Sequence, residues 1–261
     1  MSDRIFKDVS VCALPDGCAW GHCCWNCIRV SGICHTETPG QDEEQEKWPG
    51  NGRIAEYMDN IRIVTLMEDN LCGDNLIAEH GLSLYIKTKK HKLLVDTGKS
   101  DKTWYNAGIR GINLSEVDTV FLSHGHYDHS GGLMSFAGIN SHADIYIREN
   151  AGGDYYSYKE GEDKYIGIDK NIMKLDGLHL ISENTVIDDE LSIYTGVKPG
   201  RLWPKGNMRL REKKNGKLVQ DTFSHEQYLV IRYDGDKYAL ISGCAHNGIL
   251  NILDEFRAIY N

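Results

Sequence analysis

The sequence predicts an α/β sandwich, in which helices cover layers of β-sheet. Short runs of apolar and β-branched residues recur between residues 61 and 242 and are typical of strands. The stretches 101–109 and 249–260 instead have the spacing of helices. The chain has 261 residues, of which 41% are hydrophobic, a fraction that supports a real core. Many strands with helices between some of them favour sheets that are covered by helices.

The expected elements follow one another along the main part of the chain. They are strand 61–66, hairpin strands 82–86 and 92–96, helix 101–109, strands 118–122 and 143–147, short strands 178–181, 185–187 and 191–195, hairpin strands 227–233 and 237–242, and helix 249–260. Residues 149–171, rich in Gly, Tyr and Glu, are expected to form an irregular insertion that can lie over a site as a lid. The basic stretch 209–217 is expected to be a solvated loop.

Composition divides the chain into three regions. Residues 1–35 form a Cys-rich N-terminal extension, 36–59 an acidic linker rich in Gly and Pro, and 60–261 the main domain. Six of the eight cysteines lie in the extension, at Cys12, Cys18, Cys23, Cys24, Cys27 and Cys34. They can bind a metal ion or an iron–sulfur cluster, or they can be reduced thiols of a loosely folded segment. The spacing leaves both interpretations open.

Charge and hydropathy limit the classes of partner. The net charge of −9 argues against a nucleic-acid binder. The sequence has no run of 18 apolar residues, so we expect no membrane segment, and its N-terminus lacks the apolar core of a signal peptide. We therefore expect a cytoplasmic protein with reduced thiols and a small-molecule substrate. A homo-oligomer is compatible with the sequence, but no motif specifies one.

A cluster of metal-binding side chains follows the strand predicted at 118–122. The cluster reads His124-Gly125-His126-Tyr127-Asp128-His129. Side chains two residues apart share one face of an extended chain, so His124 and His126 can point to the same site. Asp128 and His129 then come from the following turn. Such a cluster at the C-terminal end of a strand predicts a site for one or two metal ions with open coordination positions.

These residues resemble a known family. The pattern His124-x-His126-x-Asp128-His129, preceded by Val-Asp-Thr-Gly at 95–98, is similar to the motif of the metallo-β-lactamase superfamily. The resemblance implies an αββα sandwich. Residues 78–83 and 242–249 further resemble one branch, the dihydropterin ribofuranosylaminobenzene 5′-phosphate synthase-like metallohydrolases. Members of that branch carry one more His in a final strand, for which this sequence has no counterpart, so either the protein is a shortened relative with a sandwich truncated at its C-terminus or the sequence is a fragment.

The resemblance also implies which residues bind metal. The expected ligands are His124, His126 and His225 for the first ion, Asp128 and His129 for the second, and Cys244 and His246 as competing donors for a further position. Asp96 is implied to orient a ligand imidazole. From the residues alone, His225 can also be an ordinary strand-end histidine, and Cys244 can be a small buried hydrophobic residue. His80 is expected to be structural, and His91 to be solvated in a hairpin turn.

The ligand types indicate the chemistry. Nitrogen and oxygen donors of this kind suit Zn²⁺ at two sites, with Mn²⁺ or Fe²⁺ as alternatives. A metal ion lowers the pKa of bound water towards about 7, which predicts a metallohydrolase that attacks an ester or phosphoester with metal-bound hydroxide. Asp128 is then expected to be both a metal ligand and a catalytic residue. The expected substrate is a small molecule that contains a pterin or a phosphate. The branch also implies a synthase that performs a phosphate-linked condensation. The alternative is a non-catalytic metal or redox binding protein with a Cys-ligated metal ion or iron–sulfur site in residues 1–35.

Overall fold

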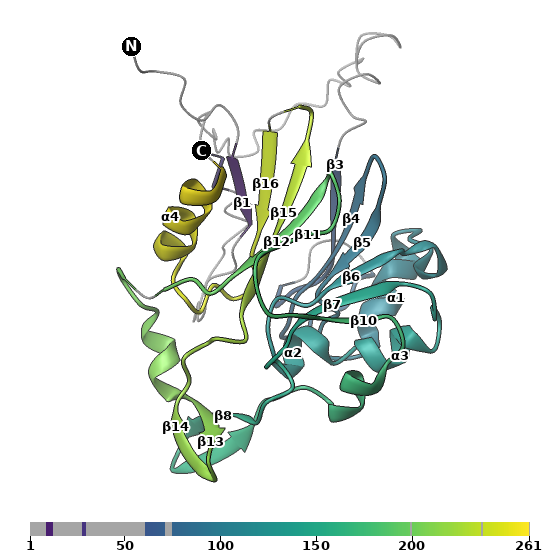
Figure 1. Ribbon diagram of the computed structural model, residues 1–261. Coiled ribbons are helices and arrows are strands. Elements are labelled where there is room, and N and C mark those ends of the chain that lie inside the picture. Colours follow the sequence, from purple (N-terminus) through teal and green to yellow (C-terminus); the bar gives the residue numbers. More distant parts are fainter. Residues whose placement is uncertain are drawn as a thin grey trace, which may run out of the picture.

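The computed structural model describes residues 9–12, 28–29, 61–70, 75–198, 200–235 and 237–260. In this part of the chain two sheets pack face to face, and helices cover both outer faces (Figure 1). The predicted αββα sandwich is therefore confirmed. The boundaries predicted at 35/36 and 59/60 lie outside the described residues and stay predictions.

Within the described residues the sandwich consists of two six-stranded sheets. The first has the order β11 (Thr185–Val186), β12 (Leu191–Thr195), β15 (Gln227–Tyr233), β16 (Lys237–Ile241), β1 (Val9–Cys12) and β2 (Ile28–Arg29). The second has the order β10 (Leu178–Ile181), β7 (Asp144–Arg148), β6 (Thr119–Phe121), β5 (Lys92–Val95), β4 (Ser83–Thr88) and β3 (Ile61–Met67). A smaller sheet beside them has the order β14 (Lys217–Gln220), β13 (Leu210–Lys214), β8 (Tyr155–Lys159) and β9 (Glu162–Tyr165).

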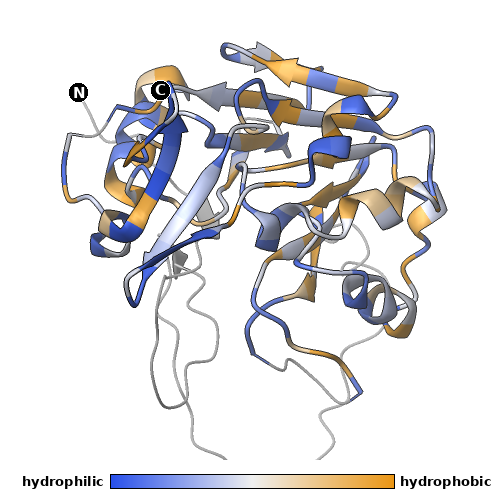
Figure 2. Ribbon diagram, turned by 90° about the horizontal axis from the view of Figure 1, so that it is seen from below, coloured by the Kyte–Doolittle hydropathy of each residue, from blue (hydrophilic) through white to orange (hydrophobic). Residues whose placement is uncertain are grey.

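The helices are short, except at the end of the chain. They are α1 (Lys102–Ile109), α2 (Tyr127–Ser130), α3 (Leu133–Ala137), α4 (Ile249–Tyr260) and the 3₁₀ helices η2 (Leu114–Glu116), η3 (Lys170–Lys174) and η4 (Lys205–Arg209). Helices α1 and α4 confirm the two helices that the sequence predicts. Both apolar and polar residues occur along the helices (Figure 2), as expected for elements that bury one face. Among the described residues, none of the helices has the length and apolar character needed to cross a membrane.

Side-chain alternation along the strands separates three apolar layers. In β4, Leu84 lies between the two sheets, while its neighbour Tyr85 packs on the outer side with α1 and α3. In β15, Leu229 lies between the sheets and Tyr228 packs beneath α4. Because both faces of each sheet are covered, the central strands are buried on both sides, which explains their nearly continuous apolar sequences.

Two segments differ from the sequence prediction. The interpretation of 149–171 as irregular is wrong, because this segment contains the β8–β9 hairpin. The basic stretch at 209–217 is likewise not a solvated loop, because it lies in the β13–β14 hairpin. All residues of β9 and β14 are exposed, so neither strand has the apolar alternation by which a strand is predicted. Backbone pairing with β8 and β13 holds them in place.

Strand ends from both sheets meet at one edge of the sandwich. β5 and β6 are parallel neighbours, so Asp96 and His124, which follow them, come out at the same edge. β16 of the other sheet ends at Ile241, and the chain then crosses towards Ser123. A Cβ atom on Gly243 would lie only 2.2 Å from Ser123 Oγ. This close approach of two segments requires glycine.

Two strands of the N-terminal extension, β1 and β2, join the sandwich. β1 runs parallel to β16, next to it in Figure 1, and pairs from Val9 opposite Tyr238 to Cys12 opposite Ile241. Of the six clustered cysteines, the other five lie outside the described residues, so their predicted metal or thiol role stays a prediction.

Candidate metal centre

The loop between β6 and α2 carries the predicted motif. His124 and His126 lie in the loop, and Asp128 and His129 lie in the single turn of α2. All four side chains are buried. Gly125 packs so tightly that a Cβ atom there would lie 2.4 Å from the carbonyl oxygen of Ala151. The motif therefore forms a compact buried group at the end of β6.

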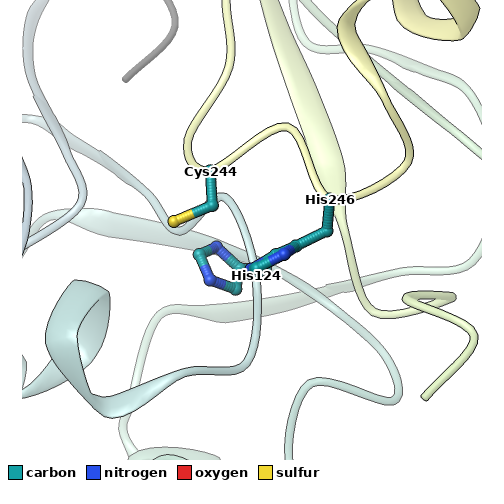
Figure 3. A group of neighbouring side chains, drawn as sticks. All are labelled: His124, Cys244 and His246. Atoms are coloured by element: carbon teal, nitrogen blue, oxygen red, sulfur yellow. The ribbon is translucent and has the colours of Figure 1, made fainter. Parts of the chain in front are cut away.

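A turn after β16 brings two further donors to this loop. Cys244 and His246 point towards His124 (Figure 3), and one potential ligand atom of each of these three residues lies within 4.8 Å of the others. The His246 ring centroid lies 5.0 Å from that of His124 and 5.1 Å from that of His126. Between the two donors, Ala245 has a φ of 53°, a strained conformation for a residue with a side chain. Cys244 and His246 thus lie in one site together.

Three buried imidazole nitrogens in this group lack a hydrogen-bond partner among the described residues. They are Nε2 of His124, His126 and His246. Nδ1 of His124 donates to Ser123 Oγ at 2.9 Å, and Nδ1 of His246 donates to Asn207 Oδ1 at 2.9 Å. These two bonds leave the unprotonated lone pair on Nε2, which is the form that binds a metal ion. A buried polar atom without a partner is costly, and coordination to a metal ion would satisfy such an atom.

The electrostatics keep these three rings neutral. Burial, with the neighbouring histidines, holds the pKa of His124 and of His246 well below the ordinary value. Burial and His225 lower the pKa of His126 to about 3. Neutral imidazoles keep their lone pairs at physiological pH, so the donor set fits a divalent cation such as Zn²⁺.

Asp128, His129 and Cys244 form a second group next to the first. Nε2 of His129 lies 3.1 Å from Cys244 Sγ and 3.6 Å from Asp128 Oδ2. Burial opposes the charge on His129, but Cys244, Asp96 and Asp128 outweigh it and raise the pKa of this ring well above the ordinary value. The ring nitrogen, the carboxylate and the sulfur of this group are donor types that a divalent metal ion binds.

His225, predicted as a ligand of the first ion, lies beside the site with both ring nitrogens engaged. Its Nδ1 accepts the backbone N–H of Gly125 at 3.0 Å, and its Nε2 lies 3.1 Å from Asp221 Oδ2. His126, Asp221 and His225 do come together as a third group of potential ligands. Asp221 was missed from the sequence, where a single Asp four residues before a His carries no specific signal. The bonds of His225 set it apart from the three histidines with unpartnered Nε2 atoms.

Three more neighbours could not be recognised from the sequence. Asn207 in η4 binds the ring of His246, and its Nδ2 donates to the carbonyl oxygen of His246 at 2.7 Å. Glu226 is buried and accepts hydrogen bonds from the backbone after Ala245. His80, expected to be structural, is 62% exposed and its Nε2 lies 3.4 Å from Asp128 Oδ2. His80 therefore contacts this carboxylate and is itself exposed to solvent.

The segment 149–171 packs against the motif loop. The N–H of Tyr127 donates to the carbonyl oxygen of Ile166 at 2.9 Å. The Tyr155 ring centroid lies 4.0 Å from that of His225 and 5.9 Å from that of His126. Tyr155 is buried there, so its ring is part of the wall of the site.

The metallo-β-lactamase superfamily matches this chain over residues 77–258, and the chain belongs to that superfamily. The fold and the His-rich site agree with this assignment. A solved structure, that of Tm1679, described as a metal-dependent hydrolase of the β-lactamase superfamily, superposes with a TM-score of 0.65 at 31% identity and covers 77% of this chain and 73% of the other.

Two proteins of Methanocaldococcus jannaschii are also similar. The 7,8-dihydropterin-6-methyl-4-(β-D-ribofuranosyl)-aminobenzene-5′-phosphate synthase is 29% identical over 222 residues, which are 76% of this chain and 72% of the synthase. Uncharacterized protein MJ0448 is 29% identical over 204 residues, which are 74% of this chain and 73% of that protein. The branch resemblance seen in the sequence is therefore confirmed.

Proposed function

We propose that the chain is a metal-dependent hydrolase that cleaves an ester or phosphoester bond of a small molecule. The set of three buried Nε2 atoms without a partner among the described residues carries the proposal. The proposed ligands are His124, His126 and His246, whose Nε2 atoms lack a partner among the described residues, for a first ion, and Asp128, His129 and Cys244 for a second. We do not include His225, a ligand that the sequence predicts, because its two ring nitrogens bond the Gly125 N–H and Asp221, neither of which belongs to the proposed ligands.

The donor types favour zinc. Three imidazoles suit Zn²⁺, and the sulfur of Cys244 in the second group favours zinc over harder ions. Mn²⁺ and Fe²⁺ are the alternatives for the group that contains the carboxylate of Asp128. Each group supplies three protein donors, so a position remains open for water or substrate.

The residues of the site have different roles in the proposed reaction. A divalent metal ion bound here would polarise the bond that is attacked and lower the pKa of water towards about 7. The carboxylate of Asp128 is placed to accept a proton from the attacking water. His80, 3.4 Å from Asp128 Oδ2 and largely exposed, can pass that proton to solvent. Asp96 holds His129 in one orientation through a hydrogen bond of 2.6 Å.

Hydrolysis of chromogenic phosphoesters and esters tests the proposal. The protein is loaded with Zn²⁺, Mn²⁺ or Fe²⁺ and compared with His126→Ala and Asp128→Ala. We expect turnover to fall at least about 100-fold in both variants, since removal of an ion or of the proton acceptor removes several kcal/mol of stabilisation of the transition state. Unchanged turnover in both variants at saturating metal would contradict the proposal.

A second candidate reaction is a synthase reaction on a phosphate-containing pterin precursor. The similarity to the M. jannaschii synthase over most of both chains favours it. Synthase activity on such a precursor, with no hydrolysis of simple phosphoesters, would select this reaction. Absence of both activities, together with sulfide released by acid, would favour the non-catalytic iron–sulfur alternative.

A further inference from the structure

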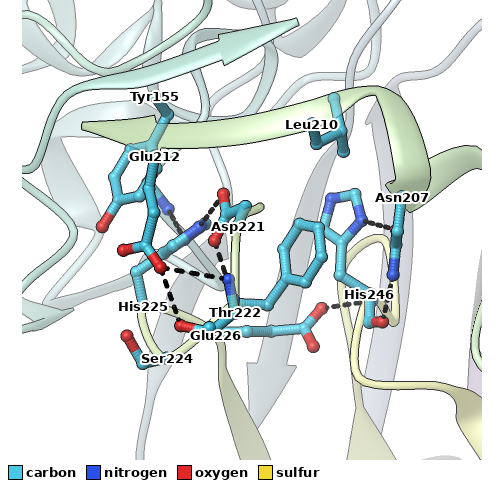
Figure 4. Close-up of polar contacts among 12 residues, drawn as sticks. Tyr155, Asn207, Leu210, Glu212, Asp221, Thr222, Ser224, His225, Glu226 and His246 are labelled. Atoms are coloured by element: carbon cyan, nitrogen blue, oxygen red, sulfur yellow. Dashed lines mark hydrogen bonds and ion pairs between the residues drawn. The ribbon is translucent and has the colours of Figure 1, made fainter. Parts of the chain in front are cut away.

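Two consecutive residues just before β15 each hold one of the two loops that carry the proposed ligands. His225 contacts the loop that contains His124 and His126, and Glu226 contacts the turn that contains His246. Figure 4 shows His225 beside Asp221, and Glu226 reaching towards His246. Neither side chain has an unpartnered buried polar atom among the described residues.

His225 holds the first loop through the peptide between the two ligand histidines. Its Nδ1 accepts the N–H of Gly125 at 3.0 Å, so that nitrogen is unprotonated and Nε2 carries the hydrogen. Nε2 donates this hydrogen to Asp221 Oδ2 at 3.1 Å. Asp221 is itself fixed, since its Oδ1 accepts the N–H of Phe223 at 2.7 Å. The ring is thus locked with its acceptor directed at Gly125.

Glu226 holds the second loop with all of its hydrogen-bonding capacity. Its carboxylate accepts the N–H of His246 at 2.8 Å, the N–H of Asn247 at 2.8 Å, the side-chain amide of Asn247 at 2.9 Å and the hydroxyl of Tyr228 at 2.6 Å. Only an acceptor on both oxygens can satisfy this set. The first two bonds follow Ala245 directly, so they hold the strained turn in place.

We propose that His225 and Glu226 are positioning residues that set the distance between the two ligand loops. The inference rests on the proposed metal function. Their backbone leads into β15, whose residues 227–231 are buried in the middle of a sheet, so both contacts start from a rigid element. A shift of either loop changes the spacing of the Nε2 atoms, and metal affinity is sensitive to shifts of a few tenths of an ångström.

Four variants test this inference. Glu226→Gln places an amide group opposite backbone N–H donors. His225→Asn can present its oxygen where Nδ1 accepts the Gly125 N–H, whereas His225→Gln reaches towards Asp221 and loses that acceptor. Ser224→Ala is the matched control, because Ser224 is exposed and its hydroxyl bonds Asn150 and not a ligand loop. Each protein is titrated with Zn²⁺ against a chelator, its metal content at saturation is determined, and its absorption with Co²⁺ is recorded.

We expect Glu226→Gln and His225→Gln to bind the full complement of metal with an affinity lower by roughly 10- to 100-fold, and with an altered Co²⁺ spectrum. The zinc affinity and Co²⁺ spectrum of His225→Asn should be closer to those of the wild-type protein than those of His225→Gln. Ser224→Ala should match the wild-type protein in both. If Glu226→Gln does not fold, the two His225 variants still test the inference.

Three outcomes would overturn the inference. Affinities and Co²⁺ spectra like those of the unchanged protein would show that the two residues do not set the loop spacing. Loss of one equivalent of metal at saturation in both His225 variants would make His225 a ligand. If the wild-type protein itself binds no metal, the proposed function is refuted. This result does not depend on the variants.

Discussion

Asp96 Oδ2 accepts the ring N–H of His129 at 2.6 Å. The same oxygen accepts the hydroxyl of Ser123 at 2.7 Å, and Oδ1 accepts the backbone N–H of Ser123, also at 2.7 Å. Asp96 is completely buried and has a φ of 56°, which is unusual for a non-glycine residue at the end of a strand. The geometry fixes His129 so that its Nε2 faces Cys244 and Asp128, as the resemblance implied for Asp96.

Replacement of Asp96 by Asn should weaken the binding of the second metal ion. The amide keeps the shape and can still accept the Ser123 N–H, but its nitrogen faces the ring N–H of His129. We expect the affinity for the second Zn²⁺ to fall roughly 10- to 100-fold, the usual effect of losing a group that orients a ligand. Titration of zinc by calorimetry measures this, and an undiminished second equivalent would count against the assigned role.

Replacement of Gly243 by Ala should destabilise the protein. The new Cβ atom would lie 2.2 Å from Ser123 Oγ and 3.3 Å from Asp96 Oδ2, so the crossing after β16 must move. Overpacking of this kind costs about 1–3 kcal/mol of unfolding free energy, measured with urea. Gly108→Ala is the control, because the site in α1 is open and alanine should be neutral or stabilising. Equal stability of the two variants would refute the prediction.

Replacement of Cys244 by Ser should remove a sulfur ligand and leave the three-histidine site intact. With Co²⁺ bound, the unchanged protein should show thiolate-to-cobalt charge transfer in the near ultraviolet, and the variant should not. The affinity for the second ion should fall because serine is a poorer donor for zinc. A charge-transfer band that persists in Cys244→Ser would show that the sulfur comes from another cysteine.

The stability of the protein should depend on the protonation of His91. Its Nδ1 lies 2.9 Å from Asp118 and its Nε2 2.9 Å from Asp188, so the expectation of a solvated ring is wrong. Burial opposes the charge, but hydrogen bonds to Asp188 and Asp118 outweigh it and raise the pKa of His91 above the ordinary 6.5. Protonated His91 therefore contributes its full stabilisation to the folded protein below pH 6.5. This stabilisation is lost as the pH rises through the higher pKa that His91 has in the folded protein.

Urea unfolding at a series of pH values, with and without His91→Asn, tests this dependence. The difference in unfolding free energy between the two proteins should be largest below pH 6.5 and should decrease at higher pH. A difference that stays constant, or that grows with pH, would contradict the assignment.

Local signals in the sequence were sufficient for most of the fold and for the centre of the site. Buried strands such as β12 and β15 have apolar sequences that predict them with their observed bounds, and His124 to His129 lie close in sequence and in space. Strands β9 and β14 were missed because every residue in them is exposed, so pairing and not burial holds them.

The partners of the site depend on contacts between distant segments, which no local pattern reveals. His225 has the sequence position of a ligand, yet Asp221 and Gly125 engage its two nitrogens. Asn207 reaches His246 from a 3₁₀ helix far away in the chain. The relation between Cys244 and His246 also required the structure, which brings both to His124 and places Cys244 beside Asp128 and His129 as well.

Elemental analysis of the protein, purified without added metal or chelator, tests the central claim most directly. The measurement is made beside His126→Ala. The account predicts about two ions of zinc, manganese or iron per chain, with a clear fall in the variant. No metal in the unchanged protein, or a single ion that survives the mutation, would contradict it, and the second result would locate the ion away from the three-histidine site.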